Sequence, residues 1–298
     1  MNYADYAGQD PVFMLHHAMI DRLFAMWQVV NQDSNNSYVN PEPALYSTFT
    51  SNAYAVQDVN TPLTPFRKNI AGDFWTSADV HGTEVFSYQY PETATYTGQN
   101  VTQKVINAIN TLYGSCVAGA VFQIDTTNQK RSTSTAIFSS GAIYNEWKAG
   151  IVFHKRALGA PFNIYLFIGP FNSDPWASPS WSMEPNLAGY HGNVIRASPC
   201  SCQADDTASA ELPLTSALIK HMDAGELKSL DPEDVVPFLM GHLQYRITLA
   251  NDTAVSNGDP RLTKLKINVL SSEVQSLGGE GSLPIWGPWR GEFDISTD

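Results

Sequence analysis

The spacing of apolar residues predicts one long helix near the N-terminus, over residues 10–31. Asp10 suits an N-cap, and Pro11 at the first helical position gives up no hydrogen bond that a helix would make. A stripe through Phe13 and His17 and the other apolar positions leaves little of the helix surface polar. Such a helix needs burial on every side. We therefore expect a second subunit, as a homodimer, or the downstream chain to cover it.

Downstream, the pattern changes towards strands. An irregular connection rich in Asn, Ser, Pro and Thr is expected over residues 32–66. Helices are expected at 101–113, 215–224 and 232–243, and strands at Phe162–Ile168 and 262–270. The predicted fold class is α+β: the remnant of a helical bundle (residues 1–70), then a mainly antiparallel β-sandwich or barrel with helical insertions (residues 71–298).

Composition narrows the function. A chain of 298 residues with 43% hydrophobic content can bury a large core. The net charge of −12, without a Lys/Arg cluster, argues against nucleic-acid binding. No secretory leader and no run of about 20 apolar residues is visible, so the sequence predicts a cytoplasmic protein that binds no membrane. An odd set of three cysteines also fits a reducing compartment.

The segment DPVFMLHHAMIDRLFAMWQ carries His16 and His17, followed by Asp21 and Arg22. It resembles the DP-x-F-x-LHH-x3-DR-x4-W segment at the second copper site of the tyrosinase and haemocyanin family. Two histidines on a buried apolar helix are costly unless something binds them. The resemblance implies that His17 corresponds to the last of six histidines that hold two coppers in this family.

Further stretches resemble the C-terminal domain of fungal tyrosinases. They lie at residues 74–93, 146–171, 213–218 and 231–247, and the first contains a Tyr-x-Tyr-Pro-Glu element at 88–92. In the family this domain sits over the copper site and restrains it until removal, and the tyrosine element is structural. Trp286 and Trp289 near the C-terminus are expected to pack in the core or to clamp the tail rather than to stack a ligand.

The remaining histidines do not supply a second set of copper ligands. They are isolated, with no H-x3-H pair: His81, His154, His191, His221 and His242. One helix face presents two imidazoles to a metal only when they stand three or four positions apart. We therefore expect no dicopper centre from one subunit in the family's way. The chain is either a fragment of a longer protein or a natural descendant that has lost the oxygen chemistry.

The cysteines suggest a different metal. If the chain around Cys200 and Cys202 is extended, both sulfurs point to one face and can hold a soft metal such as zinc. Fungal tyrosinases often carry a cysteine pair in this region, usually with a longer spacing. Cys116 can add a third sulfur, and thiolates with the His17 imidazole suit tetrahedral zinc. Buried, unligated thiols are the alternative.

Three functions follow from these residues. The chain resembles the shortened zinc enzymes of fungal alkaloid clusters, the cyclopenase type, and we favour cleavage of a cyclopenin-like benzodiazepine alkaloid to a quinolone without redox chemistry. A fragment of a tyrosinase or catechol oxidase that uses copper, and a non-catalytic chaperone or inhibitor of such an oxidase, are the alternatives.

In the favoured mechanism, zinc on His17 and cysteine sulfur acts as a Lewis acid. His16 then moves a proton. Asp21 is the second candidate catalytic residue because it can orient an imidazole one turn away. Hydrogen-bonded histidines in an inherited core, with structural roles for Asp21 and Arg22, are the alternative.

Overall fold

The computed structural model describes residues 4–31, 41–44, 51–94, 100–114, 143–193, 195, 207–275 and 282–295. The chain divides into two compact units, residues 11–108 with 198–204, and residues 1–10, 109–197 and 205–298. These limits differ from the predicted domains 1–70 and 71–298, and separate folding of those domains stays a prediction. In the described ranges, helices are mixed with sheets whose strand pairings are all antiparallel, in agreement with the α+β class.

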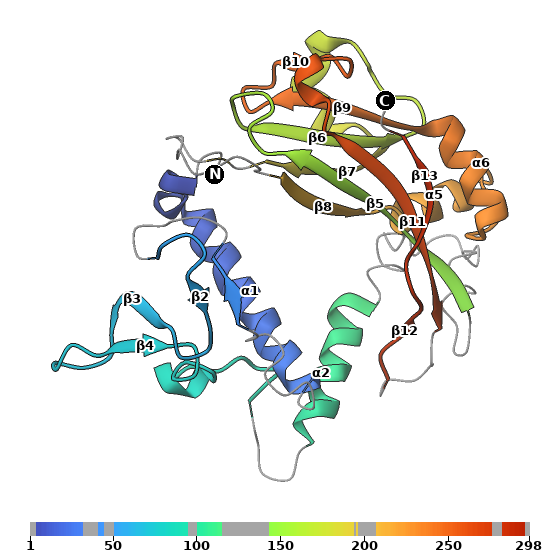
Figure 1. Ribbon diagram of the computed structural model, residues 1–298. Helices are drawn as coiled ribbons and strands as arrows, with labels where there is room; N and C mark the ends of the chain where they lie inside the picture. Colours follow the sequence, from blue (N-terminus) through green and yellow to red (C-terminus); the bar gives the residue numbers. More distant parts are fainter. Residues whose placement is uncertain are drawn as a thin grey trace. The chain divides into compact units, whose positions relative to one another are not determined.

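The smaller unit contains the N-terminal helix and a series of short elements (Figure 1). Helix α1, Pro11–Val30, agrees with the predicted bounds to within one residue and follows the 3-10 helix η1, Ala4–Gln9, of the other unit. The other elements are β1 (Glu42–Pro43), β2 (Val56–Gln57), β3 (Pro62–Arg67), β4 (Phe74–Thr76), η4 (Thr83–Phe86) and α2 (Val101–Ile109). The described part of the predicted irregular connection therefore includes strands, because β1 pairs with β2 and β3 with β4.

The larger unit contains two sheets (Figure 1). One has the order β12-β11-β5-β8 with β13 beside β11, and the other has the order β10-β9-β6-β7. The strands are β5 (Ile143–His154), β6 (Phe162–Ile168), β7 (Leu187–Gly192), β8 (Thr207–Pro213), β9 (Leu243–Leu249), β10 (Ala254–Val255), β11 (Lys266–Gln275), β12 (Ile285–Trp286) and β13 (Arg290–Asp294). The β6 strand has the predicted bounds.

Strand β11 departs from its prediction. The sequence placed a strand over 262–270, whereas β11 begins at Lys266 and ends at Gln275. A short 3-10 helix, η7 (Pro260–Leu262), occupies the expected start. The Asp259 side chain accepts a hydrogen bond from the Arg261 backbone nitrogen at 2.9 Å, which stabilises a turn there instead of an extended chain.

Two helices of this unit, α5 (Thr215–Asp223) and α6 (Pro232–His242), lie at their predicted positions, whereas η6 (Pro175–Met183) was not predicted. The unit also contains the π turn η5 (Asn110–Gly114). The helix expected over 101–113 is thus an α-helix, α2, continued by the π turn. None of the described helices is both long and apolar enough to cross a membrane.

Both sheets contribute to one hydrophobic core. Trp147 of β5, Ile164 of β6 and Ile267 of β11 are all fully buried within it. The Trp147 indole nitrogen donates to the Leu230 carbonyl at 2.9 Å, so this large side chain is buried without an unpaired donor. Full burial of each such side chain stabilises the fold by about 1.5–3 kcal/mol. The more specific description, the remnant of a helical bundle followed by a β-sandwich or barrel, stays a prediction.

Trp286 and Trp289 lie outside this core. Both are exposed, in contrast to the first alternative of the prediction. The Trp286 indole nitrogen donates to the Glu146 carboxylate at 2.6 Å, and the Lys148 ammonium lies 4.0 Å from the centre of the Trp289 ring. The two tryptophans therefore clamp the C-terminal segment onto β5, which is the second alternative.

Candidate functional site

Helix α1 is exposed over most of its surface, including Met14 at 60% and Leu15 at 71%. Ala25 and Met26 are its buried residues, whereas Ile20, Phe24 and Trp27 are 50%, 40% and 38% exposed. The described chain therefore does not cover α1 on every side, and cover by a second subunit stays a prediction. Ile20, Phe24 and Trp27 recur three and four positions apart, so they form one continuous stripe.

The paired histidines belong to this stripe. His16 and His17 are both exposed, so the expectation of histidines on a buried helix is corrected. Ile20, Phe24 and Trp27 stand three, seven and ten positions after His17, which places them on the same side of the helix. We call His16, His17, Ile20, Leu23, Phe24 and Trp27 the open stripe.

His17 is held in one orientation. Its Nδ1 atom lies 2.7 Å from the Phe13 carbonyl oxygen, and its ring centre lies 3.9 Å from that of Phe13. A carbonyl only accepts, so Nδ1 carries the proton and Nε2 keeps a lone pair. Metal-binding histidines are usually anchored in this way. The His16 ring stands edge-on to His17, with centres 5.5 Å apart.

Asp21 lies one turn after His17 on α1, against the Tyr-x-Tyr-Pro-Glu element. Its carboxylate accepts hydrogen bonds from the Tyr88 hydroxyl at 2.7 Å and the Tyr90 hydroxyl at 2.6 Å. Burial, together with the negative charge of Asp21, raises the pKa of both tyrosines to about 12. The sequence predicted that Asp21 would orient an imidazole, but its partners are these two phenols.

Arg22 extends the same contact. Its Nη2 and Nε atoms donate to the two Glu92 carboxylate oxygens at 2.5 and 3.2 Å, which is a bidentate ion pair. The Arg22 guanidinium holds the pKa of the Glu92 carboxyl below its usual range. We call these five residues, Asp21, Arg22, Tyr88, Tyr90 and Glu92, the tyrosine clamp. The sequence predicted structural roles for Asp21 and Arg22, with Arg22 reaching into residues 71–298, and its pairing with Glu92 agrees with this. The two tyrosine partners of Asp21 were not predicted.

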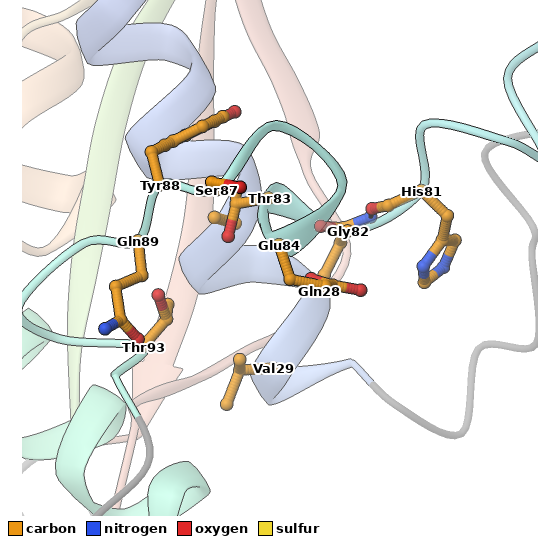
Figure 2. Close-up of a pocket in the computed structure, with 11 residues that line it drawn as sticks. Gln28, Val29, His81, Gly82, Thr83, Glu84, Ser87, Tyr88, Gln89 and Thr93 are labelled. Atoms are coloured by element: carbon orange, nitrogen blue, oxygen red, sulfur yellow. Dashed lines mark hydrogen bonds between the residues drawn. The ribbon is translucent and has the colours of Figure 1, made fainter. Parts of the chain in front are cut away.

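A pocket of about 720 Å³ adjoins the clamp (Figure 2). Its walls are the last turns of α1, the 3-10 helix η4 and the chain that follows η4. Tyr88 belongs to both the pocket and the clamp. The close-up shows side chains of Gln28, Glu84 and Gln89 around this space.

The described residues do not complete a metal site. Within the ranges given above, no three or more His, Cys, Asp or Glu side chains gather where they could hold a metal. The predicted ligands Cys116, Cys200 and Cys202 lie outside the described residues. His17 fits a single metal ligand, but the described chain does not fit a complete copper pair.

The family pattern described as the common central domain of tyrosinase matches residues 1–30, and the tyrosinase C-terminal domain matches residues 146–269. A tyrosinase of Neurospora crassa is 28% identical over 92% of this chain and 53% of its own length. One from Podospora anserina is 30% identical over 74% of this chain and 47% of its own length. The chain is tyrosinase-like.

The fold of this tyrosinase-like chain is similar to that of a solved tyrosinase structure. Recombinant mushroom tyrosinase superposes with a TM-score of 0.75 at 19% identity, covering 100% of this chain and 51% of the mushroom protein. At that identity the likeness concerns the fold alone. The tyrosinase-like chain thus spans about half the length of the curated tyrosinases it matches.

Proposed function

We propose that the chain contributes one copper ligand, His17, and the C-terminal domain to a tyrosinase-type phenol oxidase. The observation that carries this proposal is the anchored imidazole, with Nδ1 on the Phe13 carbonyl at 2.7 Å and Nε2 at the open stripe. The tyrosine clamp supports it, because it fixes the helix one turn after His17. In this role the chain positions a ligand, and the bound copper pair supplies the oxygen chemistry.

The similarity to tyrosinases favours copper over zinc as the metal that His17 binds. Proteins named tyrosinase match 92% and 74% of this chain, and the tyrosinase family implies copper. Imidazole is a suitable ligand for copper as well as for zinc, so the ligand type alone does not decide. The zinc-dependent, cyclopenase-type lyase has no support from these relatives. Its sulfur ligands fall outside the described residues.

The open stripe gives a second part of the proposal. An exposed apolar row that also carries the metal ligand is suited to a covering segment that brings further ligands. We favour a histidine-bearing helical segment, from sequence beyond these 298 residues or from another chain, over the predicted homodimer. A second copy would cover apolar surface but adds only one more His16–His17 pair.

Copper titration of the purified chain tests the first part. Wild type is expected to bind one Cu²⁺ through His17, and His17→Ala should weaken binding at least about tenfold, the effect typical of losing a ligand contact. His16→Ala is the matched control, since it removes an equally exposed imidazole from the adjacent position. Equal copper affinity in wild type and His17→Ala would contradict the proposal. Zinc-dependent turnover of cyclopenin would instead establish the lyase.

Sedimentation of the purified chain tests whether a separate segment covers the open stripe. The chain alone is expected to self-associate weakly and to show no catechol oxidation. Addition of a tyrosinase central domain with vacant copper positions is expected to give a defined complex that gains copper. A stable homodimer that binds a copper pair without any added domain would contradict the proposal that a histidine-bearing segment covers the open stripe.

A further inference from the structure

We propose that the pocket beside the tyrosine clamp binds a neutral carbohydrate of one or two rings. The residues of α1 that line the pocket are Ala25, Gln28 and Val29, none of which belongs to the open stripe, and the proposal is independent of the copper proposal. Its volume of about 720 Å³ falls within the range of about 300–1,000 Å³ that is typical of small-molecule sites.

The lining chemistry favours a neutral, hydrogen-bonding ligand. Hydroxyls of Thr83, Ser87 and Thr93 and carboxamides of Gln28 and Gln89 surround the space. These groups both donate and accept hydrogen bonds, as sugar hydroxyls do. Among the described lining residues there is no Lys or Arg, and the ionisable side chains are those of His81 and Glu84. The Glu84 carboxylate disfavours a phosphate or carboxylate ligand, which would also lack the Lys or Arg that usually binds it.

Part of the wall is apolar and suits the carbon–hydrogen faces of a sugar ring. Ala25 and Val29 of α1 contribute aliphatic surface, and the Tyr88 ring is 39% exposed. The Tyr88 hydroxyl is already bound by Asp21 at 2.7 Å. Its ring is therefore held in place before any ligand arrives, which reduces the entropy lost on binding.

The polar side of the pocket is also fixed by the backbone. Ser87 has a left-handed conformation with φ of 58°, uncommon for a residue other than glycine, and its amide donates to the Glu84 carbonyl at 3.0 Å. Gln28 donates to the His81 carbonyl at 3.1 Å, which ties the rim to α1 (Figure 2). The turn thus presents side chains at set positions.

Several lining groups are available to a ligand. Within the described part of the chain, the side chains of Thr83, Ser87 and Gln89 make no hydrogen bond to protein. Figure 2 shows Thr83, Glu84 and Gln89 at the pocket. A sugar would replace water on these groups and gain the apolar contacts that water cannot make.

Calorimetric or NMR titration with maltose, cellobiose and N,N′-diacetylchitobiose tests the proposal, with inorganic phosphate as the anionic comparison. At least one disaccharide is expected to bind with a dissociation constant in the millimolar range or below, and phosphate is expected not to bind. Gln89→Ala and Thr83→Val should each weaken that binding severalfold. Gln275→Ala, an exposed glutamine of the other compact unit, is the matched control.

Folding of each variant is checked by circular dichroism and by the midpoint of thermal unfolding. The two pocket variants, Gln89→Ala and Thr83→Val, lie on different sides of the turn at Ser87. If one of them fails to fold, the other still tests the proposal. Absence of binding by all three disaccharides overturns the proposal. Equal binding by wild type and both folded pocket variants, or binding of phosphate in preference to the sugars, overturns it as well.

Discussion

The Tyr90 hydroxyl donates to the Asp21 carboxylate at 2.6 Å, across 69 positions of sequence. Tyr88 binds the same carboxylate at 2.7 Å, so one charged group fastens a distant segment to α1. Because hydrogen bonds to a charged group are worth more than neutral ones, this carboxylate is expected to be a main determinant of the stability of the smaller unit.

Replacement of Asp21 tests this role. Asp21→Ala leaves the Tyr88 hydroxyl without its acceptor and the Tyr90 hydroxyl with only the longer contact to the Ala18 carbonyl at 3.3 Å. The substitution is expected to lower the free energy of unfolding by about 1–3 kcal/mol. Urea denaturation followed by tyrosine fluorescence measures the change. Asp294→Ala, an exposed aspartate of β13, is the control and should change stability by less than about 0.5 kcal/mol. Equal effects of the two substitutions would contradict the assignment.

The two raised tyrosine pKa values predict alkaline sensitivity. In the folded chain Tyr88 and Tyr90 lose their protons near pH 12, compared with about 10 for an ordinary tyrosine. A folded-state pKa above the unfolded value stabilises the protein fully below pH 10, and this stabilisation is lost as the pH rises from 10 to 12. The stability difference between wild type and the Tyr88→Phe, Tyr90→Phe double variant should therefore shrink over that interval. A constant difference would show that the hydroxyls titrate normally.

The Arg22–Glu92 pair predicts the opposite pH dependence. The pKa of Glu92 is lowered from 4.5, so its contribution is present above pH 4.5 and is lost as the pH falls through the folded-state value. Glu92→Gln should destabilise wild type at pH 7 and have a smaller effect at pH 3, as measured by urea denaturation. Glu273→Gln, an exposed carboxylate of β11, serves as the control and should show no such change.

A pair of tryptophan substitutions separates core packing from surface clamping. Trp147→Phe removes volume from the core and leaves the Leu230 carbonyl without its donor, so a loss of about 2–4 kcal/mol is expected. Trp286→Phe removes one exposed hydrogen bond to Glu146 and should cost about 1 kcal/mol or less. Thermal or urea unfolding gives both values, and a larger loss at Trp286 would contradict this ranking.

The open stripe predicts self-association. Ile20→Ser and Leu23→Ser each remove exposed apolar surface from α1 and should reduce concentration-dependent association in sedimentation, without lowering thermal stability. Val236→Ser on α6 is a contrasting variant, because that residue packs against the core and its loss should destabilise the fold. Unchanged association in both stripe variants would show that another surface is responsible.

Local signals in the sequence were sufficient for several elements. Asp10 and Pro11 mark the start of α1, and the apolar run of β6 gives that strand its bounds. The shifted start of β11 could not be predicted from alternation alone, because the Asp259 side chain competes for the backbone just before it. Helix positions were thus better predicted than strand limits.

The candidate site was predicted less well. The motif around His17 was visible, but the partners of Asp21 were not, because no local pattern reports a contact over 67 positions. Burial of α1 was overestimated for a related reason. Periodicity shows that a helix has apolar sides, whereas which of them are covered depends on the other parts of the protein.

Both histidines share one surface of α1 with the exposed apolar residues of the open stripe. If the covering segment is absent, a single chain is therefore at once deficient in metal and prone to aggregate. Protein quality control that recognises exposed apolar surface would then remove the chains that carry an incomplete metal site. Maturation of the metal centre and survival of the polypeptide would be selected together, through one face of one helix.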